Sequence, residues 1–238
     1  MKNKKVNFKS LGLVDYAETH DYQKKLFEQI IEIKIANRKV EETNQSTTEN
    51  HLLFCEHPHV YTLGRSGKGN HLLANPEQLK KIGATYHETG RGGDITYHGP
   101  GQLVGYPILD LDNFFTDIHK YMRLMEEAII LTCAHYGVDA GRIAGLTGVW
   151  LDYDEQKNPR NPRKICAMGV KTSRWVTMHG FALNVNVDLN YFNYIVPCGI
   201  SDKAVTSLEK ELGNKIDLKE LETILKNHFT NLFEMTIV

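Results

Sequence analysis

Residues 90–107 read GRGGDITYHGPGQLVGYP, and this glycine-rich stretch carries the densest pattern in the chain. Its glycines permit positive φ angles and let the backbone approach a ligand closely. A turn that leads into an alternating strand over 94–98 would expose N–H donors beside a slot. A long thin ligand could then lie against the main chain at Gly92 and Gly93. The same pattern is typical of a turn-rich β-hairpin with purely structural glycines, and composition alone favours that alternative.

Outside this stretch, the chain mixes strand and helix patterns without a strict alternation of the two. Apolar periodicity predicts strands over residues 3–9, 52–55, 147–153, 164–170 and 181–188, and helices over 15–36, 76–82, 116–136 and 218–233. Polar stretches at 38–50 and 154–163 predict exposed loops. The mixture predicts an α+β fold, in which a mixed β-sheet is flanked by helices.

The length and composition fit one ordinary globular domain that spans residues 1–238. The formal net charge of −1 argues against a general nucleic-acid-binding protein. No apolar run approaches the roughly 20 residues that a membrane span needs, and no apolar stretch follows the basic residues at the start. We therefore expect a cytoplasmic protein that binds neither nucleic acid nor membrane.

Cysteine spacing predicts neither a metal site nor a disulfide framework. Cysteines stand at positions 55, 133, 166 and 198, with no CxxC pair and no Cys/His cluster at zinc-site spacing. The first three lie in apolar segments and are expected to be small buried residues. Cys198 lies in VPCGI, where Pro197 fixes its own φ and Gly199 loosens the next turn, so its sulfur could face a cleft. On these residues alone, a structural role for Cys198 is still the more frequent outcome.

A second glycine-rich segment, GRSGKG at residues 64–69, has the composition of a phosphate-binding loop. It lacks the GxxxxGK[ST] spacing that such a loop requires. The segment is therefore expected to be a mobile surface loop rather than a nucleotide site.

Several segments, in one order, resemble the octanoyltransferases of lipoate biosynthesis. Within 90–107 the chain has Arg-Gly-Gly, Thr-aromatic-His, Gly-Gln and Gly-Tyr at the family's spacing. The same order is kept by EHPHVYTLG (56–64), GVW (148–150), KICAMG (164–169), HGFALNV (179–185) and PCG (197–199). The resemblance runs from about residue 50 to residue 200 and departs from the family only in the polar stretches near 40–50 and 154–163.

This resemblance implies a fold similar to the catalytic domain of the biotin and lipoate protein ligases. It implies that Cys198 is the nucleophile that carries the acyl group as a thioester. It also implies that Lys164 lowers the pKa of this thiol and shuttles the proton. The acyl-binding positions carried over from the family are Arg91, Gly92, Gly93, Asp94, Ile95, Thr96, Tyr97, His98, Ala167, Met168, Gly169, Gly180, Phe181 and Ala182. Since each buried CH₂ contributes about 0.8 kcal/mol, a pocket of fixed depth could measure chain length.

The implied reaction is transfer of an octanoyl group from octanoyl-acyl carrier protein to a lysine of a lipoyl domain. The implied acceptors are the lipoyl domains of 2-oxoacid dehydrogenases and the glycine cleavage H protein. A covalent intermediate predicts ping-pong kinetics, and no cofactor is expected. His98 and His179 could serve as acid or base, but they are expected to shape the pocket or bond the ligand.

A basic run follows the polar loop and could dock an acidic carrier protein. It comprises Lys157, Arg160, Arg163, Lys164, Lys171 and Arg174, with no Asp or Glu between residues 157 and 174. A solvated loop with no partner is an equally frequent outcome for such a run.

Three other functions stay open at this point. An ATP-dependent lipoate or biotin ligase would share the fold but needs no nucleophilic cysteine. A non-catalytic acyl-binding module would release the octanoyl group unchanged. A generic cysteine hydrolase would give free octanoate whether or not a lipoyl domain is present.

Overall fold

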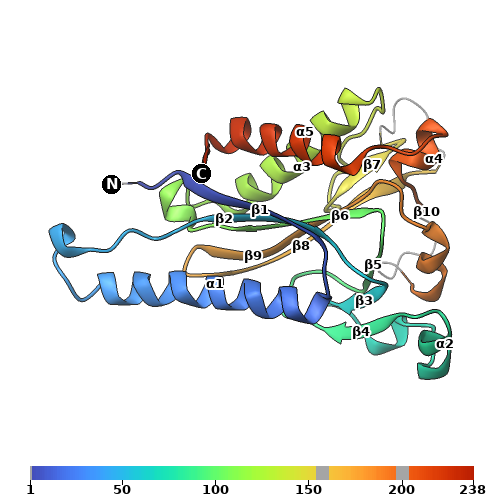
Figure 1. Cartoon of the computed structure of the whole chain (residues 1–238), viewed down its shortest axis with the longest axis horizontal. Coiled ribbons are helices and arrows are strands. Elements are labelled where there is room, and N and C mark those ends of the chain that lie inside the picture. The colour runs from blue at the N-terminus through green and yellow to red at the C-terminus, as the bar shows by residue number, and fades with distance from the viewer. Residues whose placement is uncertain (1, 154–160, 197–203) are drawn as a thin grey trace.

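A mixed β-sheet forms the centre of the molecule in the computed structural model, which describes residues 2–153, 161–196 and 204–238 (Figure 1). Its strands follow the order β10-β8-β9-β6-β2-β1-β11, and β7 pairs with β8. Their bounds are β1 Lys5–Leu13, β2 His51–Glu56, β6 Gln102–Ile108, β7 Val149–Leu151, β8 Arg163–Ser173, β9 Val176–Asn184, β10 Ala204–Val205 and β11 Thr236–Ile237. Parallel pairs (β1 with β2 and β11, β8 with β10) stand beside antiparallel pairs in one sheet, so the predicted mixed α+β architecture is confirmed.

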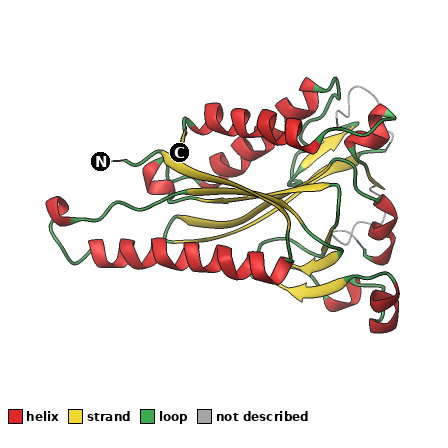
Figure 2. Cartoon of the chain, viewed as in Figure 1, coloured by secondary structure: helices red, strands yellow, loops and turns green. Residues whose placement is uncertain are grey.

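Helices cover both faces of this sheet (Figure 2). They are α1 Tyr16–Asn37, α2 Pro76–Lys81, α3 Ile118–His135, α4 Leu208–Leu212 and α5 Leu218–Phe233. In Figure 1, α1 lies along one face, and α3 and α5 lie on the other. Side-chain carboxylates cap the N-termini of the long helices. Asp15 accepts from the backbone N–H groups of Ala17 and Glu18 at α1, and Asp217 accepts from those of Lys219 and Glu220 at α5.

Side-chain alternation along the central strands explains why both faces need a cover. Leu52 and Phe54 of β2 pack in the cluster that includes α3 and α5, whereas Leu53 and Cys55 pack against α1. Strand β9 is buried over its whole length. This corrects the predicted strand over 181–188: β9 begins five residues earlier and ends at Asn184. A strand buried on two faces shows no clear polar alternation from which its start can be read.

A smaller sheet lies beside the large one and carries the glycine-rich turn. Its order is β4-β3-β5, with bounds Thr85–Glu88, Val60–Leu63 and Thr96–His98. A separate apolar cluster, which includes Tyr61, Tyr97 and Phe192, packs around it. The expected strand over 94–98 is therefore present as β5, although it is shorter and starts at Thr96.

Among the described helices, none combines the length and the apolar character that crossing a bilayer requires.

Phe229 lies at the centre of the packing between the sheet and α5. Its ring is fully buried and stacks on Phe181 (5.5 Å between centroids) and Phe233 (5.6 Å). Phe229→Ala is expected to lower the free energy of unfolding by about 3–5 kcal/mol, because the surrounding rings cannot move to fill the cavity that it leaves. Urea denaturation measures this loss. Asn227→Ala, an exposed change on the same helix, should stay within about 0.5 kcal/mol of wild type, and equal effects of the two changes would contradict this account of the core.

Candidate active site

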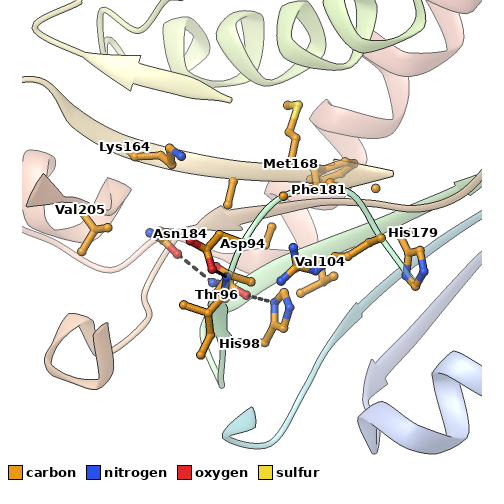
Figure 3. A pocket seen from close by; sticks show the side chains of 18 of the residues that line it. Asp94, Thr96, His98, Val104, Lys164, Met168, His179, Phe181, Asn184 and Val205 are labelled. Carbon is orange, nitrogen blue, oxygen red and sulfur yellow. Dashed lines mark hydrogen bonds between the residues drawn. The ribbon is translucent and has the colours of Figure 1, made fainter. Parts of the chain in front are cut away.

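A pocket lies between the β8–β9 hairpin and the glycine-rich turn (Figure 3). It holds about 830 Å³ of empty space, part of it open to solvent, which is within the range of small-molecule sites. Most of the acyl-binding positions predicted from the resemblance line it: Arg91, Gly93, Asp94, Ile95, Thr96, His98, Ala167, Met168, Gly169, Gly180, Phe181 and Ala182. The structure thus brings three separate segments together, while their role in binding a ligand stays a prediction.

Two of the predicted acyl-binding residues do not line the pocket. Gly92 instead donates its backbone N–H to the carbonyl of Val170 on β8 (2.9 Å), which ties the glycine-rich turn to the hairpin. Tyr97 is fully buried in the smaller sheet, where its hydroxyl lies 2.7 Å from Nδ1 of His59 and its ring stacks on Tyr191. Tyr97 points away from the pocket because neighbouring residues of a strand point to opposite faces, and both residues support the wall without lining it.

Glycines are required where the turn and the hairpin meet. Gly169 on β8 pairs with Gly180 on β9. A Cβ at Gly169 would lie 2.5 Å from the carbonyl oxygen of Gly92, and a Cβ at Gly180 would overlap the carbonyl oxygen of Gly105. The backbone itself thus forms part of the pocket wall at this pair.

Arg91 holds the turn together from inside. Its guanidinium donates to the carbonyl (2.6 Å) and the hydroxyl (2.9 Å) of Thr62 on β3 and to the carbonyl of Gly92 (3.1 Å). The side chain is nearly buried. The positive charge also disfavours protonation of the imidazoles nearby, and it contributes to lowering the pKa of His98.

The hydrogen bonds around His98 fix it as a neutral imidazole. The side-chain nitrogen of Gln102 donates to the Tyr97 carbonyl and to Asn184, so the Gln102 oxygen must accept from Nδ1 of His98 (2.8 Å; Figure 3). Nε2 of His98 then accepts from the Thr62 hydroxyl (3.2 Å). Burial, with smaller contributions from His57 and Arg91, lowers the pKa of His98 to about 3. A neutral ring suits a pocket wall better than it suits an acid that must give up a proton near pH 7.

Lys164 stands at one end of the pocket. It lies on β8, and its ammonium sits over the ring of Trp150 on β7, 4.5 Å from the centroid. A cation in this position is attracted by the negative face of the ring. Val205 on β10 pairs with Lys164 and also lines the pocket, so the structure places this predicted catalytic residue at the pocket.

Cys198, the predicted nucleophile, lies outside the described residues. The described chain on either side of 197–203 is held near the pocket. On the near side, the backbone N–H of Val196 donates to the carbonyl of His71 (2.8 Å), and Nδ1 of His71 lies 2.7 Å from the carboxylate of Asp94. On the far side, Ala204 pairs with Arg163 of β8.

The remaining cysteines are buried, as predicted. Burial raises the pKa of the Cys133 thiol to about 12 and raises those of Cys55 and Cys166 further. Cys55 does lie near an imidazole, with its sulfur 3.5 Å from Nε2 of His57. This imidazole already faces the hydroxyl of Tyr106 at 2.7 Å, and a fully buried thiol with a raised pKa is not a nucleophile.

Sequence reasoning missed several residues of the pocket. Tyr16, Val104, Tyr106, Asn184, Phe192 and Val205 line it as well. Tyr16 comes from the start of α1, and no local pattern indicates a contact with residues so far along the chain. Gln102 could have been found, because it stands in the quoted motif and its amide group bridges His98 and Asn184.

The GRSGKG segment is a surface loop, but it is also part of the site's framework. The backbone N–H groups of Arg65 and Ser66 donate to the carbonyls of Arg91 (2.9 Å) and Gly93 (3.0 Å). The side chains of both donors are exposed. The loop thus supports the glycine-rich turn from the solvent side, and its expected mobility stays a prediction.

The basic run is partly compensated by carboxylates from outside it. Arg163 donates to Asp152 and, through two nitrogens at 3.0 Å each, to Glu211 on α4. These partners hold the pKa of Arg163 above its ordinary value. Lys157 and Arg160 lie outside the described residues. Carrier docking on this run stays a prediction, with Arg163 already engaged within the chain.

Comparison with known proteins assigns the chain to a family. The lipoyl protein ligase A/B catalytic domain matches residues 15–230, and the chain belongs to this family. Relatives within it are octanoyltransferases: that of Cytophaga hutchinsonii is 61% identical over 99% of this chain and 95% of its own length, and that of Flavobacterium johnsoniae is 58% identical over 99% and 100%. The family predicted from the sequence motifs is therefore confirmed.

Solved structures bear out the fold. A bi-partite lipoate protein ligase from Thermoplasma acidophilum superposes with a TM-score of 0.67 at 17% identity, over 100% of this chain and 86% of its own. A biotin protein ligase from Aquifex aeolicus superposes with a TM-score of 0.52 at 15% identity, over 96% and 70%. At such low identity, this similarity shows the shared fold alone.

The neutral state of His98 makes stability depend on pH. Its folded pKa of about 3 lies below the ordinary 6.5, so the unfolded chain binds more protons between these values and stability falls as the pH falls through this window. His98→Asn is expected to make the fall in the free energy of unfolding with decreasing pH shallower by up to about 1.4 kcal/mol per pH unit. Urea denaturation between pH 7 and pH 4 measures the slope. The exposed change His119→Asn should leave the slope unchanged, and a wild-type slope in His98→Asn would contradict the buried neutral ring.

Proposed function

We propose that this octanoyltransferase carries the octanoyl group on Cys198 as a thioester, with Lys164 as its electrostatic and proton-transfer partner. The donor is octanoyl-acyl carrier protein, and the acceptor is a lysine of a lipoyl domain. One observation carries the proposal: an ammonium at the end of a pocket with an apolar lining, beside the described flanks of the segment that holds Cys198.

The described chain before Cys198 supports the pairing of the two groups. Val196 precedes Cys198 by two residues in the sequence. Val196 is held to His71, which pairs with the pocket residue Asp94. Lys164 lines the same pocket.

In the first half-reaction, the Cys198 thiolate attacks the carbonyl carbon of the donor thioester. The bond from this carbon to the carrier's sulfur breaks, and the carrier leaves as a thiolate that takes up the proton released by the Cys198 thiol, with Lys164 as the relay. A nearby ammonium favours the ionised form of the attacking thiol. Since one thioester replaces another, the exchange is nearly balanced in free energy and needs no ATP.

In the second half-reaction, the neutral amine of the acceptor lysine attacks the Cys198 thioester. The new C–N bond forms as the C–S bond breaks. The Lys164 ammonium stabilises the departing Cys198 sulfur by charge and gives it a proton, and Lys164 then takes up the proton that the amine nitrogen loses. Conversion of a thioester to an amide runs downhill and completes the transfer.

The pocket lining suits an unbranched saturated chain. Met168, Phe181 and Ala182 supply apolar surface, and Gly169 and Gly180 leave room along the backbone. The imidazoles present are neutral, as the lowered pKa of His98 illustrates. Apart from Arg91, Asp94 and Lys164, the lining is uncharged, and burying a charge beside an apolar chain would be unfavourable.

The same proposal names the particular acceptors. They are the lipoyl domains of 2-oxoacid dehydrogenases and the glycine cleavage H protein. Residues 1–238 act as a single domain, and the reaction takes place in the cytoplasm.

The acyl-enzyme step can be tested by intact-mass analysis after mixing with octanoyl-acyl carrier protein without ATP. Wild type should gain one octanoyl group, which a lipoyl domain then removes, and Cys198→Ser should gain none. An adduct that persists in Cys198→Ser, or a transfer that needs ATP and free octanoate, would refute the thioester route. Free octanoate without an acceptor would indicate a hydrolase.

The role of Lys164 has its own readout in the reactivity of the thiol. Lys164→Ala should slow alkylation of Cys198 by iodoacetamide at pH 7 by about tenfold, because the thiol pKa rises by about one unit without the ammonium. Lys171→Ala is the matched control, since Lys171 lies on the same strand, outside the pocket and over Phe27. Equal rates in wild type and Lys164→Ala would contradict the pairing.

A further inference from the structure

His179 on β9 has a backbone that is unusual for a buried residue. Its φ is +63°, in the left-handed region that a non-glycine residue adopts only at a cost in energy. The residue is 2% exposed, and its backbone N–H donates to the side-chain oxygen of Gln23 on α1 (3.2 Å). Strain of this kind persists where the surrounding structure holds it and often marks a functional position.

The imidazole of His179 is neutral and incompletely bonded. Burial, with smaller contributions from His20 and Arg91, lowers its pKa to about 3. Its Nε2 has no hydrogen-bond partner among the described residues. No hydrogen bond among the described residues explains why Nε2 of a buried ring is held here.

His179 lies at the opposite end of the pocket from Lys164. Both line the pocket, and the antiparallel register places His179 opposite Val170, one pair beyond Gly169 and Gly180. Figure 3 shows Lys164 and Val205 on one side of the pocket and His179 on the other.

The ring of His179 is backed by α1. The ring of His20 stacks on it, with 5.6 Å between centroids and 26° between planes. The bond from the His179 backbone to Gln23 ties the same part of β9 to α1. The ring therefore cannot move away from the pocket without disturbing the contact between helix and sheet.

The length of the pocket between these ends fits a short acyl chain. From Asn184 to His179 the strand advances five residues, or about 17 Å at about 3.3 Å per residue. An extended chain of eight carbons, with bonds of about 1.5 Å, spans about 9 Å. The thioester and the side chains at the Lys164 end take up the rest.

We propose that the imidazole of His179 is the end wall of the acyl pocket and sets the upper limit on the length of the chain that the enzyme transfers. This inference rests on the proposed function and names the residue that determines chain length. A chain longer than eight carbons must push its last methylenes against a ring that α1 holds in place.

Shortening the side chain should open this end. His179→Gly removes the ring and suits the positive φ, so the variant is expected to fold. Two additional buried methylenes contribute about 0.8 kcal/mol each, which corresponds to about a tenfold gain. We expect the decanoyl-to-octanoyl ratio of kcat/KM, measured with the two acyl-carrier proteins, to rise about tenfold. His179→Asn, which tolerates the same backbone conformation, should shift the ratio in the same direction.

Glu234→Gly is the matched control. Glu234 also has a positive φ (+52°), but it is exposed at the end of α5 and does not line the pocket. This variant relieves the same backbone constraint and should keep the wild-type ratio. A wild-type ratio in both His179 variants, or a uniform loss for all chain lengths in both, would overturn the end-wall assignment.

Binding of free fatty acids separates this inference from the proposed function. Calorimetric titration with octanoate, decanoate and dodecanoate needs no thioester and no acceptor. Relative to wild type, His179→Gly should bind decanoate more tightly by about tenfold and octanoate about equally. If wild type forms no octanoyl adduct, the thioester proposal fails. If wild type forms the adduct and neither variant changes chain-length preference, only the end-wall assignment fails.

Discussion

The antiparallel register between β8 and β9 is the constraint on which the site depends. Both strands lie inside a sheet that is covered on each side by helices, so a shift by one residue would move buried side chains to the wrong layer. With the register fixed, Lys164 stands at one end of the pocket, and the glycine pair lies next to His179 at the other end. The chemistry at one end and the space at the other are thus set by a single ladder of hydrogen bonds.

The glycine-rich turn completes this hairpin from a different sheet. Arg91 binds the turn to β3 through Thr62, and Gly92 binds it to β8 through Val170. Burial lowers the pKa of His98, and the guanidinium of Arg91 adds to this shift. Arg91 therefore shapes the pocket wall and also helps to keep a neighbouring imidazole neutral.

The sequence predicted the elements whose pattern is local. The helix over 218–233 was placed at its observed bounds, because its apolar residues repeat at helical spacing and Asp217 caps its start. Strand β9 was displaced, since burial on both faces removes the alternation that would show where it begins. The motifs located most of the pocket through resemblance to a family. Tyr16 could not be found this way, because its place beside His98 depends on how α1 packs on the sheet.

The close meeting of Gly169 and Gly180 with the carbonyls of Gly92 and Gly105 limits how the protein can change over time. A larger residue at Gly169 would push the glycine-rich turn away from β8, and one at Gly180 would push β9 away from β6, so such a variant disturbs the fold before its effect on substrate choice matters. Changes in specificity are thereby confined to residues whose side chains can vary without separating these segments. A lineage that adapts to a different acyl group would show substitutions at the end away from Lys164 and unchanged glycines beside them.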